Sequence, residues 1–106
     1  MSRPLCLSLI QLDVRDADPR ENVARAAEFV RRAPGADVYV LPELWTTGYA
    51  HATWPHAADA HAEETLAAMR AWAAERDAWI AGSHVERRAS DGALVNRLRV
   101  VGPAGE

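Results

Sequence analysis

The chain has 106 residues, 49% of them hydrophobic and 25% charged, and a net charge of −3. This composition is ordinary for a globular protein and argues against disorder and against membrane insertion, while the length allows one domain at most, residues 1–106. The mild negative charge argues against a nucleic-acid partner, which usually needs a basic surface.

The first predicted element is a strand within residues 5–14. Leucines alternate there with other apolar residues, as in a strand buried on both faces. No long apolar run with a cleavage site precedes it, so we expect no signal peptide. Cys6 is the one cysteine of the chain. It excludes an internal disulfide, fits a cytoplasmic location, and is expected to be a small buried thiol.

A helix is predicted next, from Asp18 to a stop at Pro34-Gly35. Asp18 can cap the helix and Pro19 suits its first position, and apolar residues then recur at helical spacing. Residues 37–41, DVYVL, are typical of a buried parallel strand. The strand, helix and strand together predict a βαβ unit.

The second half of the chain begins with an irregular stretch, residues 45–61, for which we predict a long loop. Trp72 and Trp79 are both expected in the core. The remaining predicted elements are a helix at 63–76, strands at 79–85 and 94–101, and a hairpin turn at 90–92. The order β-α-β-α-β-β indicates an α/β layered fold with a terminal hairpin.

Glu43 is the first candidate for chemistry. It follows the second predicted strand directly, and sites in open α/β sheets collect at the carboxyl ends of strands. Shielding from water by Leu41, Leu44 and Trp45 would suit its carboxylate to the role of a general base. From position alone, however, an ordinary solvated glutamate at a strand end is the favoured interpretation.

Metal and nucleotide sites are weaker candidates. His51, His56 and His61 are spaced by five, with Asp59 and Glu63 nearby, but this spacing matches no metal motif, so polar loop residues are the favoured interpretation. There is no G-x-G-x-x-G sequence, which disfavours a nucleotide-binding domain. No metal and no cofactor are expected.

Five short motifs follow one another along the chain. Residues 9–13 read LIQLD in the first predicted strand, and Asn22 stands near the start of the first predicted helix. Residues 41–49 read LPELWTTGY and residues 79–83 read WIAGS. Residues 96–105 begin with an asparagine and end in a P-x-G turn. In this order the motifs resemble the first strand, the helix-opening asparagine, the "PE…TGY" signature, the "GS" strand and the "N…P-x-G" strand and turn of the nitrilase superfamily of carbon–nitrogen hydrolases. The match covers nearly the whole chain.

The resemblance implies that residues 1–106 are the N-terminal fragment of a single domain, an incomplete part of an αββα sandwich. It also implies an amidase or nitrilase that hydrolyses non-peptide C–N bonds of a small amide through a Glu–Lys–Cys triad. In the family the cysteine forms a thioester, the glutamate is the general base and the lysine stabilises the oxyanion. Glu43 matches the glutamate. Trp45 and Tyr49 either line the substrate pocket or serve in packing.

Two of the three catalytic residues have no match. The sequence contains no lysine, and Cys6 lies where the family performs no chemistry. We therefore expect this chain alone to be inactive. The alternative is a non-catalytic interaction module, or half of a split enzyme that needs a complementing C-terminal chain. A sheet that ends after four strands would expose an edge and an apolar face, which favours association, including homo-oligomers.

Overall fold

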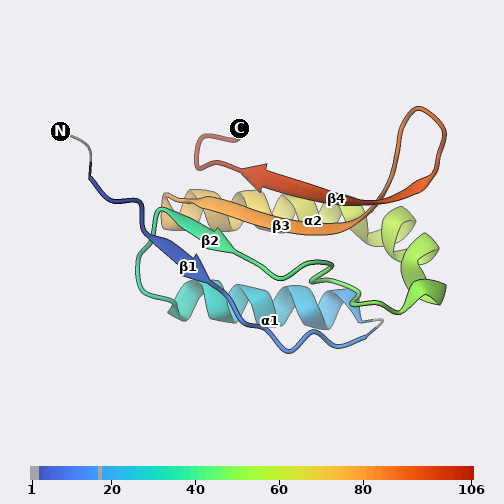
Figure 1. Ribbon diagram of the computed structural model, residues 1–106, viewed down its shortest axis with the longest axis horizontal. Helices are drawn as coiled ribbons and strands as arrows, with labels where there is room; N and C mark the ends of the chain where they lie inside the picture. The colour runs from blue at the N-terminus through green and yellow to red at the C-terminus, as the bar shows by residue number, and fades with distance from the viewer. Residues whose placement is uncertain (1–2, 17) are drawn as a thin grey trace.

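The structure is a computed structural model that describes residues 3–16 and 18–106, and its elements follow the predicted order (Figure 1). The four strands form one sheet in the order β1-β2-β3-β4, in which the first three are parallel and the last is antiparallel. This confirms the α/β class and the initial βαβ unit. The elements are β1 (Leu7–Leu9), α1 (Pro19–Arg32), β2 (Val38–Val40), the 3-10 helix η1 (His51–Thr53), α2 (Trp54–Arg76), β3 (Trp79–Arg87) and β4 (Leu94–Val101).

Helix α1 begins and ends where its sequence predicts. The Asp18 side chain accepts a hydrogen bond from the Glu21 backbone N–H at 3.2 Å, and Pro19 occupies the first helical position. The Asp18 side chain satisfies one free backbone N–H at the helix start, and Pro19 has no N–H that needs a partner. Ala26 and Val30, one turn apart, are fully buried, so this face of the helix packs inward.

Helix α2 begins nearer the N-terminus than predicted, because residues 45–61 are not all loop. The helix starts at Trp54, with Pro55 in its first turn, and Ala57 and Ala58 are its first buried residues. Alanine has the highest helix propensity, but its small side chain produces a weak hydrophobic pattern. The histidines and aromatic residues between these alanines therefore obscured the helical pattern, although the helix propensity of alanine favours a helix there.

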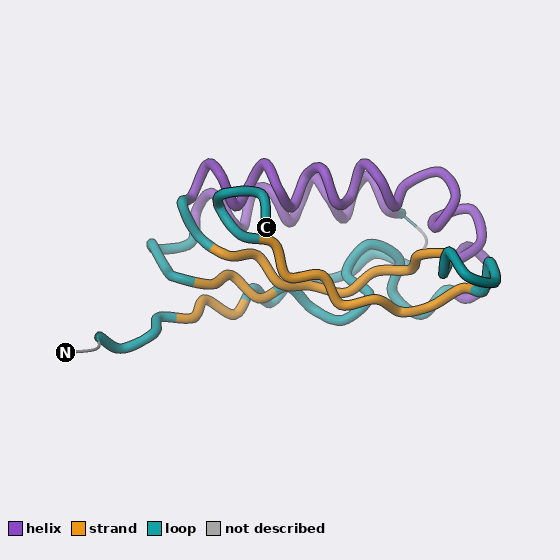
Figure 2. Tube along the Cα trace, turned by 90° about the horizontal axis from the view of Figure 1, so that it is seen from above, coloured by secondary structure: helices purple, strands orange, loops and turns teal. Residues whose placement is uncertain are grey.

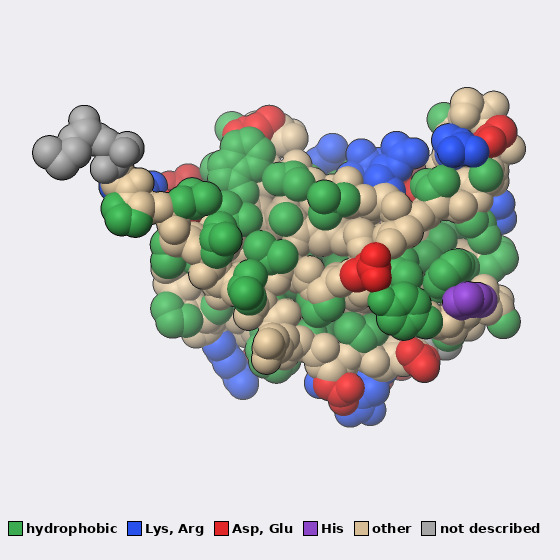
Figure 3. Space-filling model, in the orientation of Figure 1, with side chains coloured by type: hydrophobic (Ala, Val, Ile, Leu, Met, Phe, Trp, Pro, Cys, Tyr) green, Lys and Arg blue, Asp and Glu red, His purple; other side chains and the backbone are tan. Residues whose placement is uncertain are grey.

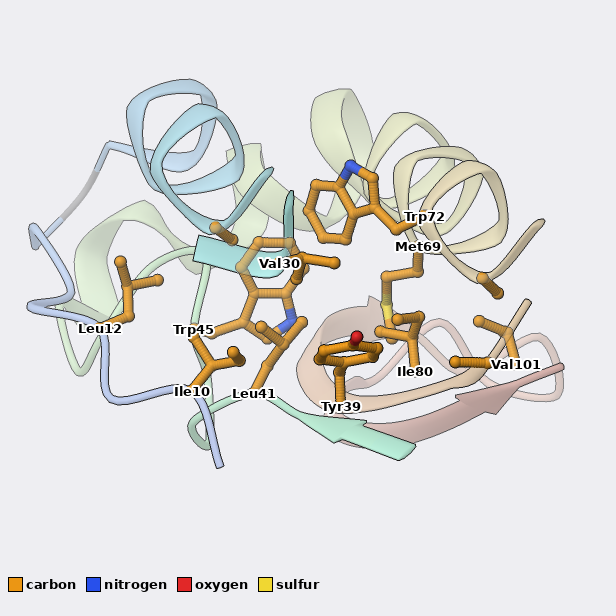
Figure 4. Packing of buried hydrophobic residues seen from close by; sticks show 13 residues of the cluster. Ile10, Leu12, Val30, Tyr39, Leu41, Trp45, Met69, Trp72, Ile80 and Val101 are labelled. Carbon is orange, nitrogen blue, oxygen red and sulfur yellow. The ribbon is translucent and has the colours of Figure 1, made fainter. Parts of the chain in front are cut away.

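Both helices lie on one face of the sheet, as the view along its edge shows (Figure 2). The main core fills the space between these layers (Figure 4). Tyr39, Ile80 and Val101 contribute from the strands, and Met69 and Trp72 contribute from α2. The prediction of a core position is thus confirmed for Trp72.

Most of the other face of the sheet is left uncovered by the described residues, and hydrophobic side chains gather on it (Figure 3). At one end of this face, Val85 is buried against Leu44 and Ala58. Leu9 is 68% exposed and Leu98 65% exposed. Three predictions are therefore wrong: the first strand is not buried on both faces, Trp79 is 38% exposed rather than in the core, and the Cys6 thiol is exposed. The reason is the same for Leu9 and Trp79, since the helices cover only the opposite face.

Within residues 3–16 and 18–106, no helix combines the length and the apolar character needed to cross a bilayer.

Candidate catalytic site around Glu43

Glu43 lies just beyond β2, at the edge of a cleft of about 310 Å³ on the open face of the sheet. Ser83, Asn96 and Leu98 line the same cleft. The side chain of Glu43 is exposed, so these residues do not shield it from water. A second cleft of about 580 Å³ adjoins the first along residues 40–41.

Two side chains donate hydrogen bonds to the Glu43 carboxylate. The Tyr49 hydroxyl donates to Oε1 at 2.7 Å, and the Asn96 side-chain amide donates to Oε2 at 3.2 Å. The hydrogen bond to the carboxylate, together with its negative charge, raises the pKa of Tyr49 above its ordinary value. Each carboxylate oxygen therefore has one donor and keeps room for a further hydrogen bond.

The backbone after Glu43 is held in an uncommon conformation. Leu44 has a φ of 50°, in the left-handed region that few residues other than glycine adopt. Its N–H donates to the Ser83 hydroxyl at 3.1 Å, and the Trp45 N–H donates to the Ser83 carbonyl at 3.3 Å. Strand β3 thus fixes the strained turn that presents Glu43. Strain of this kind is often found at functional sites.

A buried asparagine ties the same loop to α1. The Asn22 side chain accepts from the Arg15 N–H at 2.8 Å and donates to the carbonyls of Arg15 at 2.7 Å and Thr46 at 2.8 Å. Gly48 lies farther along the loop with a φ of 61°, and a Cβ there would collide with the Asp16 carboxylate. These contacts fix residues 44–48 from the side opposite to β3.

The two predicted pocket residues are placed differently. Tyr49 is 63% exposed and contacts Glu43, whereas Trp45 is 0% exposed. Trp45 packs in the core with its ring centroid 5.7 Å from that of Trp72 (Figure 4). Trp45 therefore does not line the cleft, and the packing alternative holds for it. In an extended strand residues 43 and 45 would share a face, and the left-handed Leu44 separates them.

The histidines of the predicted loop contact their neighbours. The His51 ring lies 4.3 Å from that of Trp54, and His61 pairs with Glu64. Within the described parts of the chain, no three histidine, cysteine or acidic side chains are grouped so as to hold a metal ion.

A buried ionic group on the helix-covered face was missed by the sequence analysis. His84 is 1% exposed, and its Nε2 lies 3.2 Å from Glu86 Oε2. Burial lowers the pKa of His84 below its ordinary value, although the Glu86 charge opposes this shift. Arg99 donates two hydrogen bonds to Glu86, at 2.7 and 2.8 Å. This group lies on the far side of the sheet from Glu43 and is structural.

The contacts of Asn96 and Ser83 with the site were also missed. Asn96 lies 53 residues from Glu43 along the chain. It comes close because β4 pairs with β3 in the register that sets Asn96 beside Val85. The hairpin signal at residues 90–92 could have predicted that pairing, but the register between strands is needed to place the amide.

Comparisons with known proteins give a consistent result. The model of the carbon-nitrogen hydrolase family matches residues 6–106. The 2-oxoglutaramate amidase of Bacillus subtilis (strain 168) is 37% identical over 102 residues, which cover 94% of this chain and 39% of that protein. The solved structure of XC1258 from Xanthomonas campestris, a CN-hydrolase superfamily protein, has a TM-score of 0.88 and 30% identity, covering 99% of this chain and 39% of that one.

A more distant structure shows the same fold. A mutant of the amidase from Nesterenkonia sp. AN1, in which acrylamide has added to the active-site cysteine, matches with a TM-score of 0.80 and 19% identity. That match covers 97% of this chain and 41% of the amidase. The present chain thus spans about two fifths of the length of the relatives that it matches.

Proposed function

Because this chain belongs to the carbon–nitrogen hydrolase family, we propose that it supplies the general base of an amidase. The base is Glu43, and the reaction is hydrolysis of a non-peptide C–N bond in a small amide. The observation that carries the proposal is the Glu43 carboxylate itself. It is exposed at the carboxyl end of a parallel strand, faces a cleft and is held by two hydrogen-bond donors.

The proposed reaction uses a cysteine and a lysine from outside these 106 residues. Glu43 accepts the thiol proton, and the thiolate attacks the amide carbon to form a tetrahedral intermediate. The lysine stabilises the oxyanion. The C–N bond then breaks to leave a thioester, and protonated Glu43 returns its proton to the departing amine. Water attacks the thioester while Glu43 accepts a proton from it, and as the C–S bond breaks Glu43 returns that proton to the thiolate.

The residues of this chain support the assignment of the catalytic cysteine and lysine to a part outside it. The sequence has no lysine. Cys6 lies at the amino end of β1, where its N–H donates to Asp37 at 2.8 Å. Glu43 follows the carboxyl end of β2, and β1 and β2 are parallel. Cys6 and Glu43 therefore lie at opposite ends of these neighbouring strands, and Cys6 cannot act as the nucleophile of this site.

The substrate class follows from the relatives. The 37% identity to a 2-oxoglutaramate amidase makes that amide the first candidate substrate. Among the described residues, no arginine lines the Glu43 cleft. A cation that binds the carboxylate of such a substrate would have to come from outside this chain.

A chimera tests the proposal. This chain would replace the matching segment of the Bacillus subtilis amidase, and ammonia release from 2-oxoglutaramate would be measured. We expect activity that Glu43→Gln reduces at least a hundredfold, since loss of a general base typically costs this much. Glu63→Gln, a change at an exposed residue of α2, is the matched control and should retain activity. Equal activity of the Glu43→Gln chimera and its parent would contradict the proposal.

One observation favours a second candidate, a non-catalytic module or half of a split enzyme. The apolar open face of the sheet, with Leu9, Leu98 and Val100 exposed, suits burial against another polypeptide. Activity on mixing this chain with a separately expressed C-terminal part of the amidase would support a split enzyme. A purified chain that sediments as a monomer and unfolds cooperatively would argue against any association. A cytoplasmic location stays a prediction.

A further inference from the structure

We propose that Tyr49 and Asn96 are positioning residues that together fix the orientation of the Glu43 carboxylate. The proposal rests on the proposed function, because orientation matters only if Glu43 accepts a proton. It assigns Tyr49 a role other than lining the pocket, and it assigns Asn96, on β4, a role in the site.

The geometry places one donor on each oxygen. Tyr49 donates to Oε1 at 2.7 Å and Asn96 to Oε2 at 3.2 Å. A single donor would leave the carboxylate free to rotate about its last side-chain bond. Two donors on different oxygens hold its plane. Hydrogen bonds to an ionised group are about twice as strong as neutral ones, so both contacts contribute to this restraint.

The two donors are themselves fixed from different directions. Asn96 belongs to β4, which pairs with β3 over its full length. Tyr49 follows Gly48, whose carbonyl accepts a hydrogen bond from the Trp54 indole at 3.2 Å. A rigid strand and an anchored loop thus meet at the same carboxylate.

The two donors are neutral, which matters for a base. A charged donor such as arginine would bind the carboxylate more tightly and oppose its protonation. A phenol and an amide orient the group while leaving each oxygen able to accept another hydrogen bond. Asn96 and Glu43 both line the cleft.

The first experiment tests the hydrogen bond between Tyr49 and Glu43 without measuring catalysis. The phenol of Tyr49 would be titrated by ultraviolet absorbance, with a Tyr49→Phe variant subtracted to remove the signal of Tyr39. Glu43 raises the pKa of Tyr49 through the hydrogen bond. Glu43→Gln should therefore return the Tyr49 pKa towards its ordinary value, and Glu63→Gln should leave it unchanged. An unchanged Tyr49 pKa in Glu43→Gln would overturn the proposal.

The second experiment measures kcat and KM in the chimera. Tyr49→Phe and Asn96→Leu should each lower kcat about tenfold with KM nearly constant, because only the orientation of the base changes. Asn96→Asp should lose more than Asn96→Leu, since it places a second carboxylate against Glu43. A purely structural role for exposed Asn96 would make these two variants alike.

The outcomes separate the two proposals. If Glu43→Gln retains full activity, the proposed function fails. If Glu43→Gln is inactive while Tyr49→Phe and Asn96→Leu keep the parental kcat, only the positioning proposal fails. Tyr39→Phe is the matched control for Tyr49→Phe, because Tyr39 lies in the core on the other face of the sheet.

Discussion

The two faces of the sheet differ in what their side chains do. The face under the helices buries Tyr39 and Ile80 in a continuous core. The open face leaves leucines exposed and presents Glu43 with its two donors. Stability of this chain therefore comes mainly from one face, and the candidate chemistry lies on the other. The loop after β2 joins them, because it sends Glu43 to one side and Trp45 to the other.

The largest expected difference in stability between the two faces is tested with two tryptophans, one on each face. Trp45→Ala removes a fully buried ring from the core and should lower the free energy of unfolding by about 3–5 kcal/mol. Trp79→Ala, on the open face, is the matched control and should cost much less. Urea denaturation followed by circular dichroism measures both. Equal losses would mean that the open face contributes as much stability as the core.

A second test removes the link between α1 and the Glu43 loop. Asn22→Ala removes three hydrogen bonds of a buried side chain, two to the Arg15 backbone and one to the buried Thr46 carbonyl, and should cost about 2–3 kcal/mol. Glu28→Ala, at an exposed position of the same helix, should change stability by less than about 0.5 kcal/mol. A loss in Asn22→Ala no larger than in the control would show that the Asn22 bonds add nothing.

A third test adds one carbon where the loop crosses the sheet. A Cβ at Gly82 would lie 3.0 Å from the Leu41 Cβ and 3.0 Å from the Trp45 indole nitrogen. Gly82→Ala should therefore destabilise the chain by about 1–3 kcal/mol through overpacking. A Cβ at Gly35 meets nothing within 4 Å, so thermal unfolding of Gly35→Ala should be nearly unchanged. A neutral Gly82→Ala would contradict the tight packing of Trp45 on β3.

The buried histidine predicts a pH dependence of stability. Burial lowers the pKa of folded His84 from the ordinary 6.5, so below about that pH the unfolded chain binds more protons than the folded chain. Stability should fall as the pH drops below about 6.5, by at most about 1.4 kcal/mol per pH unit for this single group. Urea midpoints measured from pH 7.5 to 5.0 check this. His84→Gln should flatten the profile, and an equally steep profile in that variant would assign the effect elsewhere.

The smallest effect is expected on the open face itself. Leu98→Ser should change the free energy of unfolding by less than about 0.5 kcal/mol, because Leu98 is already exposed. It should also weaken self-association in sedimentation velocity. Ile80→Ser, on the helix-covered face of the neighbouring strand, should instead destabilise strongly. A large loss in Leu98→Ser would place Leu98 in a packed environment.

Local signals predicted the elements well where they were strong. Asp18 and Pro19 predicted the start of α1, and residues 90–92 predicted the hairpin. The burial of whole faces was predicted less well, because apolar residues on both sides of a strand do not show which side a helix will cover. Leu9 and Trp79 were misplaced for this reason.

The candidate site was predicted only in part. The ordered motifs indicated Glu43 and Tyr49, and both lie together. For Trp45 the resemblance left pocket lining and packing open, and the left-handed Leu44 turns its side chain to the core. Asn96 required the register of β4, and Asn22 required the path of the loop. Such long-range contacts depend on tertiary geometry that the local sequence pattern does not contain.

The hydrogen bond from Asn96 has a consequence for the order of events during synthesis. During synthesis, Glu43 and Tyr49 emerge from the ribosome well before β4 does. The hydrogen bond from Asn96 to Glu43 can therefore form only after the hairpin of β3 and β4 has closed. The orientation of Glu43 is completed only when the last described strand has paired. A chain released before residue 96 would contain the residues of both helices but would lack the hydrogen bond from Asn96 that orients Glu43.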